Sequence, residues 1–484
     1  MLLSSVTEKL SVGVIHRYQL ILSSEPSEDS EVVLSITNLA SVVKNLDLFN
    51  GSYGFSANCS PADPERPTLP LTDLTPELQF SPSVFCGATW STKLPHKMTN
   101  FVIDLASELI TSESFIPYKI EVFSKTKSDH KEAPLEVSLK SVDTNEIWGT
   151  LKFDEEVEKT VHLVILNHGL MGSQLDLLHM KEEIERDNFS SSDTRVVVVV
   201  CDVNHRLTTD GVYTGGLRIA NNILEEVEWE NRFGNSASTS NMSYKVSFIG
   251  HSLGGVYNLC SIGILEQKTD GRFFDVFKPC HFITLASPLL GSIEHPWVAN
   301  QFCAIGGMGQ SGRDLMLVDH NEEIPGFTDV ATSSKSILVN ISHPGSPSYQ
   351  ALSKFQDRTA YSNIANDISV GFLTSSLASK FDVSKYTGGL LRKLFSKPIP
   401  QETIVHVEEI ELNEESKVED FLNLQQLPDL AQGIAIDLQT NLHWKKVLVY
   451  MSKLTAHTDI IVRRWPRNSD GSKVIQHLLK HHPF

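Results

Sequence analysis

The chain has 484 residues, 40% of them apolar and 21% charged, which is enough for a sizeable core in two domains or one elaborated domain. Acidic residues outnumber basic ones by 59 to 41, and the net charge of −18 argues against nucleic acid as a partner, because phosphate contacts need clustered Lys and Arg. No metal-finger spacing, basic leader or long apolar run occurs, so we expect no metal site, secretory signal or spanning helix.

Residues 1–155 are predicted to form a β-rich domain. Short alternating apolar segments are separated by loops rich in Pro, Ser and Asp, a pattern typical of a small sandwich. No catalytic cluster occurs in this region, so an accessory or membrane-facing role is expected. The expected strands are 16–22, 32–36, 101–105 and 118–123.

Residues 156–484 alternate apolar strands with helices, which predicts an α/β domain with a mostly parallel sheet and helices on both faces. No G-x-G-x-x-G follows any of these strands, and no cofactor is expected. The expected strands are 161–167, 195–203, 244–250, 281–286, 358–364 and 444–451, and two of the expected helices are 216–232 and 256–267.

An insertion at 373–443 interrupts this alternation. It contains a short apolar and basic segment, 388–397, followed by an acidic run from Glu408 to Asp420. A long insertion beside a candidate site is often a cap or binding element. A cap helix is favoured here, although an apolar-basic segment could also dip into a lipid surface.

The segment Gly250-His-Ser-Leu-Gly254 lies between the strand 244–250 and the helix 256–267. A strand that turns sharply into a helix around a serine is a nucleophile elbow. Glycine at 250 and 254 allows a strained backbone and a close approach of strand and helix. Ser252 is therefore the candidate nucleophile.

A serine hydroxyl needs a base, and the base needs a carboxylate that orients it. On the α/β-hydrolase fold these groups follow strands in the chain order Ser, Asp or Glu, His. Asp367 follows the strand 358–364, and His457 follows the strand 444–451, so these are the predicted acid and base. Asp319 and Asp329 are weaker acids because no clear strand precedes them.

The other histidines fit the role of the base less well. His251 is expected to pack or bond locally, and the remaining ones precede the acid, lie in the insertion, or come before the last strand. The C-terminal tail is expected to be frayed. The histidines set aside on these grounds include His205, His295, His320, His343, His406, His443, His477, His481 and His482.

Two backbone N–H groups are predicted to form the oxyanion hole. One belongs to Leu253, directly after the nucleophile. The other belongs to Leu170 in the loop His168-Gly169-Leu-Met-Gly172, which follows the strand 161–167. Histidine and glycine at 168 and 169 let the chain turn so that this N–H points into the site.

With these residues assembled, the chain resembles the fungal putative serine-esterase family, lipase-like proteins of the α/β-hydrolase superfamily. The resemblance spans roughly residues 160 to 465, and the segment 12–18 also looks like the start of the N-terminal region of longer fungal members. It rests on the motifs Asn167-His-Gly-Leu-Met-Gly172 with Asp176, Gly250-His-Ser-Leu-Gly-Gly255, Leu285-Ala-Ser-Pro-Leu-Leu-Gly291, Ser311-Gly-Arg-Asp-Leu315, Asn366-Asp-Ile-Ser-Val370 and Ala456-His-Thr-Asp-Ile-Ile-Val-Arg463.

The resemblance implies Ser252 as nucleophile, Asp367 as acid and His457 as base. It implies lipid acyl esters, such as phospholipids or acylglycerols, as substrates. It also implies work at internal membranes or lipid droplets, so we expect an intracellular protein, cytoplasmic or peripheral at the endoplasmic reticulum or a droplet. Gly371 stands where the resemblance leads us to expect proline, and we expect it to loosen the loop that holds Asp367.

The predicted function is thus a serine lipase or phospholipase that acts through an acyl-serine intermediate. A soluble carboxylesterase or thioesterase would use the same residues and differ only in its pocket. A non-catalytic adaptor that keeps the fold for protein binding is the alternative from another class. The oligomeric state, the lipid head group and the acyl chain length stay open.

Overall fold

The computed structural model divides into two compact units, Met1–Thr150 and Leu151–Arg463 together with Asn468–Phe484. The expected boundary between residues 155 and 156 lies outside the described residues. The residues that the structure describes are 1–11, 13–26, 30–41, 54–71, 83–107, 115–126, 135–149, 160–188, 194–233, 242–292, 308–320, 324–327, 334–386, 403–409, 417–463 and 469–484.

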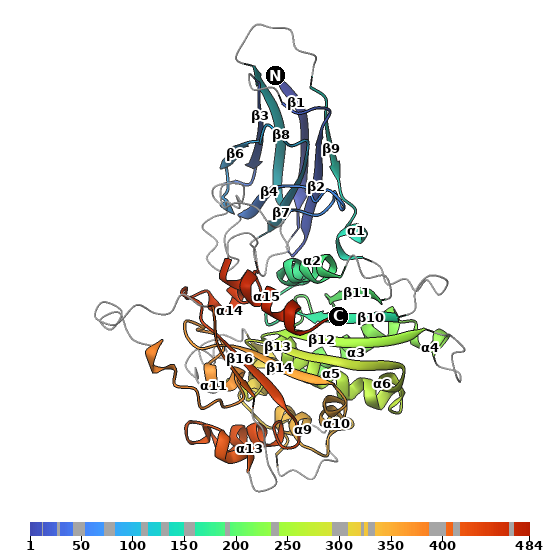
Figure 1. Ribbon diagram of the computed structural model, residues 1–484, viewed down its shortest axis with the longest axis vertical. Coiled ribbons are helices and arrows are strands. Elements are labelled where there is room, and N and C mark those ends of the chain that lie inside the picture. The colour runs from blue at the N-terminus through green and yellow to red at the C-terminus, as the bar shows by residue number, and fades with distance from the viewer. Residues whose placement is uncertain are drawn as a thin grey trace. The chain divides into compact units, whose positions relative to one another are not determined.

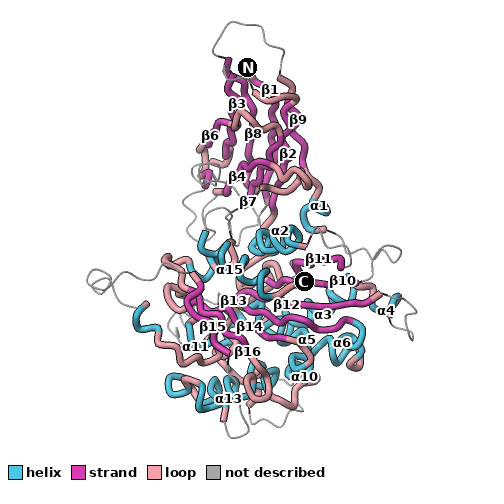
Figure 2. The backbone as a smooth tube through the Cα atoms, viewed as in Figure 1, coloured by secondary structure: helices cyan, strands magenta, loops and turns pink. Residues whose placement is uncertain are grey.

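The first unit is β-rich, as predicted, and consists of two antiparallel sheets (Figures 1 and 2). Their strand orders are β1-β8-β3-β6 and β5-β4-β7-β2-β9. Inward-facing side chains of both sheets belong to one hydrophobic cluster, as expected of a sandwich. The elements are β1 (Leu2–Leu10), β2 (Ile15–Leu22), β3 (Ser30–Asn38), β4 (Phe55–Pro61), β5 (Ser83–Val84), β6 (Thr89–Lys93), β7 (Asn100–Ser107), β8 (Ile116–Thr126), β9 (Val137–Ser141) and α1 (Thr144–Trp148).

A buried ion pair joins two strands of this unit. Arg17 on β2 is only 1% exposed and lies opposite Asp104 on β7. Its Nε and one terminal nitrogen donate to the two carboxylate oxygens at 2.7 and 2.8 Å. Because both charges are paired and hydrogen-bonded, the pair is a structural feature of the sandwich.

The second unit is built on a sheet of seven strands in the order β11-β10-β12-β13-β14-β16-β15. Neighbours from β11 to β16 run parallel, and β15 pairs with β16 in the antiparallel direction. The predicted α/β-hydrolase fold is confirmed. The strands are β10 (Thr160–Asn167), β11 (Thr194–Cys201), β12 (Ser243–His251), β13 (Phe277–Leu285), β14 (Asp357–Asn363), β15 (Ile404–Glu409) and β16 (Trp444–Val449).

Helices cover both faces of this sheet (Figure 1). The helices α2 and α15 lie on one face, and α3, α5 and α10 lie on the other, where α5 packs against both α3 and α10. The helices are α2 (Leu178–Asp187), α3 (Val212–Glu226), α4 (Trp229–Arg232), α5 (Leu253–Lys268), α6 (Arg272–Val276), α8 (Gly309–Leu315), α9 (Ile337–Ser342), α10 (Pro347–Ser353), α11 (Phe372–Ser375), α13 (Asp429–Asp437), α14 (Ala456–Asp459) and α15 (Ser469–His481). None of the helices in the described residues is both long and apolar enough to cross a membrane.

Three expectations about this unit need correction or fall outside the description. The helix predicted over 216–232 is two helices, because Glu228 adopts a left-handed conformation with φ 49°. The insertion contributes the edge strand β15, which contains the first two residues of the expected acidic run, Glu408 and Glu409. The apolar-basic segment 388–397 lies outside the described residues.

The C-terminal tail is ordered instead of frayed. Residues 469–481 form α15, whose side chains at Val474, Ile475 and Leu478 are at most 1% exposed. His482, which follows the helix, is 2% exposed. The apolar face of this amphipathic helix anchors the end of the chain. The prediction of a frayed tail was wrong because it considered only the closeness to the terminus.

Candidate active site

Ser252 stands at a sharp turn between β12 and α5. Its backbone has φ 55° and ψ −129°, a conformation that side-chain-bearing residues rarely adopt. The Ser252 N–H donates to the carbonyl of Leu285 on the neighbouring strand at 2.9 Å, and the Ser252 carbonyl accepts from the N–H of Gly255 at 3.1 Å. These bonds hold the strained turn in place, as expected for the predicted elbow.

The elbow depends on two glycines. A Cβ atom built at Gly250 would lie 2.4 Å from the backbone nitrogen of Gly255. One built at Gly254 would lie 2.2 Å from the carbonyl oxygen of Asn167, at the end of β10. Both contacts involve backbone atoms, so neither position has room for a larger residue. The close approach of α5 to two strands therefore explains the supporting role predicted for these glycines.

Asp367 and His457 are brought into contact. The Nδ1 atom of His457 lies 3.0 Å from Oδ2 of Asp367, and the exposed fractions of the two side chains are 14% and 3%. Asp367 also accepts from the side-chain amide of Asn363 at 2.9 Å and from the N–H groups of Ser369 and Val370 at 3.0 and 2.9 Å.

These donors determine the charge state of Asp367. Burial alone would raise the pKa of its carboxyl group, but the charge and hydrogen bond of His457, with the bonds from Val370 and Asn363, outweigh burial and lower the pKa. The carboxylate is therefore ionised at neutral pH. It can hold Nδ1–H of His457 and leave Nε2 free to accept a proton.

Hydrogen bonds fix the loop that holds Asp367, although we expected glycine at 371 to loosen it. Asn366 donates to the carbonyl of Met451 at 2.6 Å, and Asp367 forms an isolated β-bridge with Thr455. Gly371 itself has φ −71°, which is the value that a proline would impose. The substitution therefore leaves the backbone conformation unchanged, and side-chain and cross-loop hydrogen bonds keep Asp367 in position.

His457 lies beside the elbow. The ring of His251, which precedes the nucleophile, is 4.8 Å from the ring of His457, and its Nε2–H donates to the His457 carbonyl at 2.7 Å. Burial lowers the pKa of His251 to about 3, so this ring stays neutral. Within the described residues Ser252 forms hydrogen bonds through its backbone and none through Oγ. The bond between a catalytic serine and its base often tightens only when substrate binds.

The loop predicted to supply an oxyanion donor passes against the serine. A Cβ atom at Gly169 would lie 2.6 Å from Cβ and 3.0 Å from Oγ of Ser252, so only glycine fits there. His168 Nδ1–H donates to the carbonyl of Gly169 at 3.0 Å. Burial lowers the pKa of His168, which keeps the ring neutral. The N–H of Leu253 belongs to the first residue of α5 and has no partner within that helix.

Arg463 and Asp176 connect the two halves of the site. Arg463 Nε donates to Oδ1 of Asp176 at 2.8 Å, and Asp176 also accepts from the N–H of Ser173 at 3.3 Å. Arg463 follows α14, which carries His457, and Asp176 follows the loop of Leu170. The sequence identified both residues only as parts of a resemblance, because nothing local shows that they meet.

The segment 311–315 has a supporting role that its sequence did not reveal. Ser311 donates to the carbonyl of Thr208 at 2.7 Å, and the Thr208 hydroxyl accepts from the N–H of Met171 in the oxyanion loop at 2.9 Å. Asp314 is fully buried and accepts from the N–H of Val212, the first residue of α3, at 2.7 Å. Through Thr208, the segment 311–315 thus helps to hold the loop 168–172 in place.

The weaker acid candidates do not join the site. Asp319 is exposed and accepts from the hydroxyl of Ser334 and the N–H of Lys335. Asp329 lies outside the described residues. A cavity of about 600 Å³ adjoins Asp367; of the described residues, its lining includes Phe372, Phe381 and Lys380 but neither Ser252 nor His457.

The chain is similar in sequence to proteins described as putative serine esterases and putative lipases. Residues 157–379 match the family model described as "Putative serine esterase". A putative lipase of Schizosaccharomyces pombe is 29% identical over 62% of this chain and 38% of its own length. A putative lipase of Saccharomyces cerevisiae is 27% identical over 78% of this chain and 58% of its own length. The chain therefore spans about four-tenths to six-tenths of these relatives.

Among solved structures, the product of the gene lin2722 from Listeria innocua aligns with 66% of this chain and 94% of its own, at 9% identity and a TM-score of 0.31. An overlap this low has no weight for fold or function. The fold assignment rests on the strand order and the elbow.

Proposed function

From the match of residues 157–379 to the putative serine esterase family model and from the geometry of the site, we propose that the chain is a serine hydrolase that cleaves acyl esters of lipids through an acyl-serine intermediate. The observation that carries this proposal is the contact of 3.0 Å between Asp367 and His457 beside a strained Ser252. A buried, ionised carboxylate on Nδ1 of a histidine next to an elbow serine is what nucleophilic catalysis needs, whereas binding alone requires none of it.

In the proposed first step, Ser252 Oγ attacks the ester carbonyl carbon while His457 Nε2 takes the hydroxyl proton. Asp367 stabilises the imidazolium that forms. The N–H groups of Leu170 and Leu253 donate to the oxyanion, each worth on the order of 3 kcal/mol in the transition state. Collapse of the intermediate breaks the bond to the alcohol, which leaves with the proton from His457.

In the second step, water attacks the acyl-serine carbonyl and gives a proton to His457 Nε2. The second oxyanion collapses, the acid leaves, and the proton returns to Ser252 Oγ. The products are one alcohol and one carboxylic acid, and the enzyme is regenerated without any cofactor.

A fluorophosphonate probe tests the nucleophile. The full chain is expected to be labelled at Ser252, and Ser252→Ala is expected to lose labelling together with ester hydrolysis. Ser261→Ala, a substitution of the same kind in the helix that follows Ser252, controls for general damage and is expected to keep both. Labelling that survives in Ser252→Ala would overturn the proposal.

Lipid substrates, and peripheral association with a membrane or lipid droplet, are the finer part of the proposal. They are supported by the relatives described as putative lipases. Rates on phospholipid or triacylglycerol particles should exceed those on short-chain soluble esters, and the chain should co-fractionate with the particles on a density gradient. Equal rates on both would favour a soluble carboxylesterase or thioesterase. A folded chain that hydrolyses no acyl ester would indicate a binding protein.

A further inference from the structure

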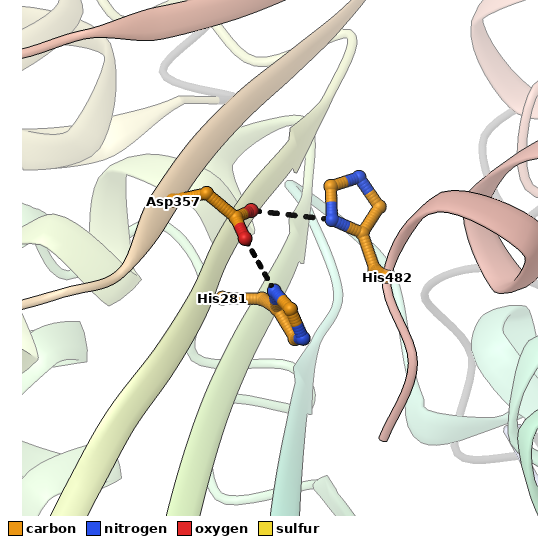
Figure 3. A group of neighbouring side chains, drawn as sticks. All are labelled: His281, Asp357 and His482. Carbon is orange, nitrogen blue, oxygen red and sulfur yellow. Dashed lines mark hydrogen bonds and ion pairs between the residues drawn. The ribbon is translucent and has the colours of Figure 1, made fainter.

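Three side chains converge on one face of the large sheet, away from the elbow (Figure 3). They are His281 on β13, Asp357 at the start of β14, and His482 directly after α15. His281 Nδ1 lies 2.9 Å from one oxygen of Asp357, and His482 Nδ1 lies 3.2 Å from the other. The three ligand atoms all lie within 4.8 Å of one another.

The hydrogen bonds of His281 identify its tautomer. Its Nε2 lies 3.0 Å from the backbone carbonyl oxygen of Pro483, which can only accept, so Nε2 carries a hydrogen. In the neutral ring, Nδ1 then presents a lone pair to a carboxylate oxygen, which also offers only lone pairs. A proton or a metal cation between the two atoms removes this repulsion. Histidines that bind metals typically donate their other ring N–H to a backbone carbonyl or carboxylate in this way.

His482 has hydrogen-bonding capacity that no described residue satisfies. Its side chain is 2% exposed, and within the described part of the chain its Nε2 has no hydrogen-bond partner. Its Nδ1 and Oδ1 of Asp357 have no described partner except each other, at 3.2 Å. Buried polar atoms are normally paired, because an unpaired one loses its hydration without replacement. One cation between the three groups would satisfy Nδ1 of both histidines and the carboxylate of Asp357 together.

We propose that His281, Asp357 and His482 bind one divalent transition-metal ion, with Zn²⁺ the best match. Two imidazole nitrogens and one carboxylate oxygen are ligands that Zn²⁺ prefers, whereas Mg²⁺ and Ca²⁺ favour all-oxygen sites. Bonds of about 2.0–2.1 Å in a tetrahedron put ligand atoms roughly 3.4 Å apart. Nδ1 of His281 and Nδ1 of His482 lie 2.9 and 3.2 Å from the two different oxygens of Asp357, so small side-chain shifts bring one oxygen and both nitrogens to this spacing.

The surroundings suit such a site. The side chain of Asp357 is 45% exposed, which gives an ion a way in and leaves a fourth position for water. The ring of Phe484 lies 5.5 Å from that of His281 and shields the other side. His162 stacks on His281 with ring centroids 6.2 Å apart, and its Nε2 is bonded to the Ser247 hydroxyl at 2.8 Å. It is not among the three described residues whose ligand atoms lie within 4.8 Å of one another.

The ion has a structural role in this proposal. His281 and Asp357 lie 76 residues apart in the sequence and are paired across two strands, whereas His482 comes from the end of the chain. A shared ion fastens α15 to the sheet. Asp357 and Asn363 are the two ends of β14, about 20 Å apart, and the elbow lies at the Asn363 end, so the ion takes no part in the reaction at Ser252.

Two other arrangements compete with this one. A second proton on His281 would turn its contact with Asp357 into an ordinary ion pair. Separately, His477 and His481 lie one turn apart on α15, with ring centroids 4.2 Å apart, and could bind Zn²⁺ at the helix surface. Matched variants separate all three.

The test uses the full chain after chelator treatment and dialysis, titrated with Zn²⁺ by calorimetry. We expect one ion per chain and a rise in melting temperature with the metal. Asp357→Asn and His482→Gln should weaken binding by more than the ~10–100-fold that loss of a second-shell partner causes. His481→Gln, the same substitution one residue earlier, should bind Zn²⁺ as the natural chain does.

Cobalt provides a measurement that needs no variant. Co²⁺ added to the natural chain should give the intense visible absorption of tetrahedral coordination, and Zn²⁺ should displace it. The proposal is overturned if the natural chain binds no Zn²⁺, if Asp357→Asn binds it equally well, or if His481→Gln and not His482→Gln removes binding. None of these readouts depends on ester hydrolysis, so they are independent of the proposed function.

Discussion

Strand β14 begins with one aspartate and is followed by another, and each meets a histidine. At the carboxyl end, Asp367 lies 3.0 Å from Nδ1 of His457; at the amino end, Asp357 lies 2.9 Å from Nδ1 of His281. The two pairs have nearly the same geometry. The distance between a carboxylate and an imidazole therefore does not by itself reveal what a pair does.

The difference lies in what surrounds each carboxylate. Asp367 accepts from an amide side chain and two backbone N–H groups, so its oxygens are fully used and its histidine has one free nitrogen. Asp357 has a second buried histidine, His482, 3.2 Å from its other oxygen and accepts from no backbone N–H group among the described hydrogen bonds. The first environment suits an orienting acid, and the second suits a cation. The predictions below test this contrast.

The largest effect is expected from Asp367→Asn. An amide in place of the carboxylate favours the wrong tautomer of His457 and cannot stabilise the imidazolium, so kcat/KM on a soluble ester should fall about 10⁴-fold. Asp357→Asn should remove Zn²⁺ binding. Its effect on kcat/KM should be at least about 100-fold smaller than that of Asp367→Asn. Comparable losses of activity in the two variants would mean that the two pairs belong to one functional unit.

The carboxyl-end pair could be predicted from the sequence because it follows a positional rule. Each of its members comes directly after an apolar strand, and their order along the chain matches that of α/β hydrolases. What the sequence could not show is how the pair is held. The bond from His251 to the backbone of His457 and the Asp176–Arg463 contact join segments that are more than 200 residues apart.

The amino-end pair was missed for a related reason. His281 falls inside a strand that reads as ordinary core, and Asp357 precedes the predicted start of the next one. Their contact depends on the register between parallel strands, which is set by packing and not by a local pattern. His482 was assigned to a frayed end, although α15 carries it back onto the sheet. The expectation of no metal site rested on cysteine and histidine spacing alone.

Gly254→Ala tests whether the carboxyl-end site depends on close approach of the backbone. The added Cβ would lie 2.2 Å from the carbonyl oxygen of Asn167, so β10 or α5 has to shift. We expect the free energy of unfolding to fall by about 1–3 kcal/mol and ester turnover to be lost. Chemical denaturation and ester assays measure the two effects.

Gly433→Ala is the matched control, because a Cβ there meets no atom within 4 Å and the residue lies in α13. It should raise the free energy of unfolding by about 0.5–1 kcal/mol. Zn²⁺ binding by a folded Gly254→Ala chain should stay within about twofold of the natural value, since side chains alone form the amino-end cluster. Loss of Zn²⁺ binding would show that the two ends of the sheet are coupled.

Stability should fall in acid because buried histidines are neutral in the folded state. Burial lowers the pKa of both His179 and His251 to about 3, against 6.5 for an exposed ring. Between these values the unfolded chain binds the proton and the folded chain does not, so the free energy of unfolding decreases as pH falls from 6.5 towards 3. The slope is up to about 1.4 kcal/mol per pH unit for each ring.

Urea denaturation at pH 6.5 and 5 measures this, with an expected loss of up to about 2 kcal/mol per ring. His179→Gln and His251→Gln should each flatten the dependence. Only His251→Gln should also lower ester turnover, because His251 contacts the base. If neither variant changes the slope, the acid sensitivity comes from other groups.

Arg463→Gln is expected to have the smallest effect. Arg463 is 29% exposed and Asp176 is 7% exposed, so their contact is partly screened by water. It connects the histidine segment with the oxyanion loop but touches neither the nucleophile nor the acid. We expect kcat to fall about 10-fold, equivalent to roughly 1.4 kcal/mol, with KM nearly unchanged, because the loop would be placed less accurately only in the transition state.

Arg463→Lys should recover part of the loss, since it restores the charge without the planar fork. Lys268→Gln, at an exposed lysine at the end of α5, is the control for a general loss of positive charge. A rise in KM with kcat unchanged would instead assign Arg463 to substrate binding. It would also show that the carboxyl-end site, like the cluster at the other end of β14, uses its charged groups chiefly to hold a ligand.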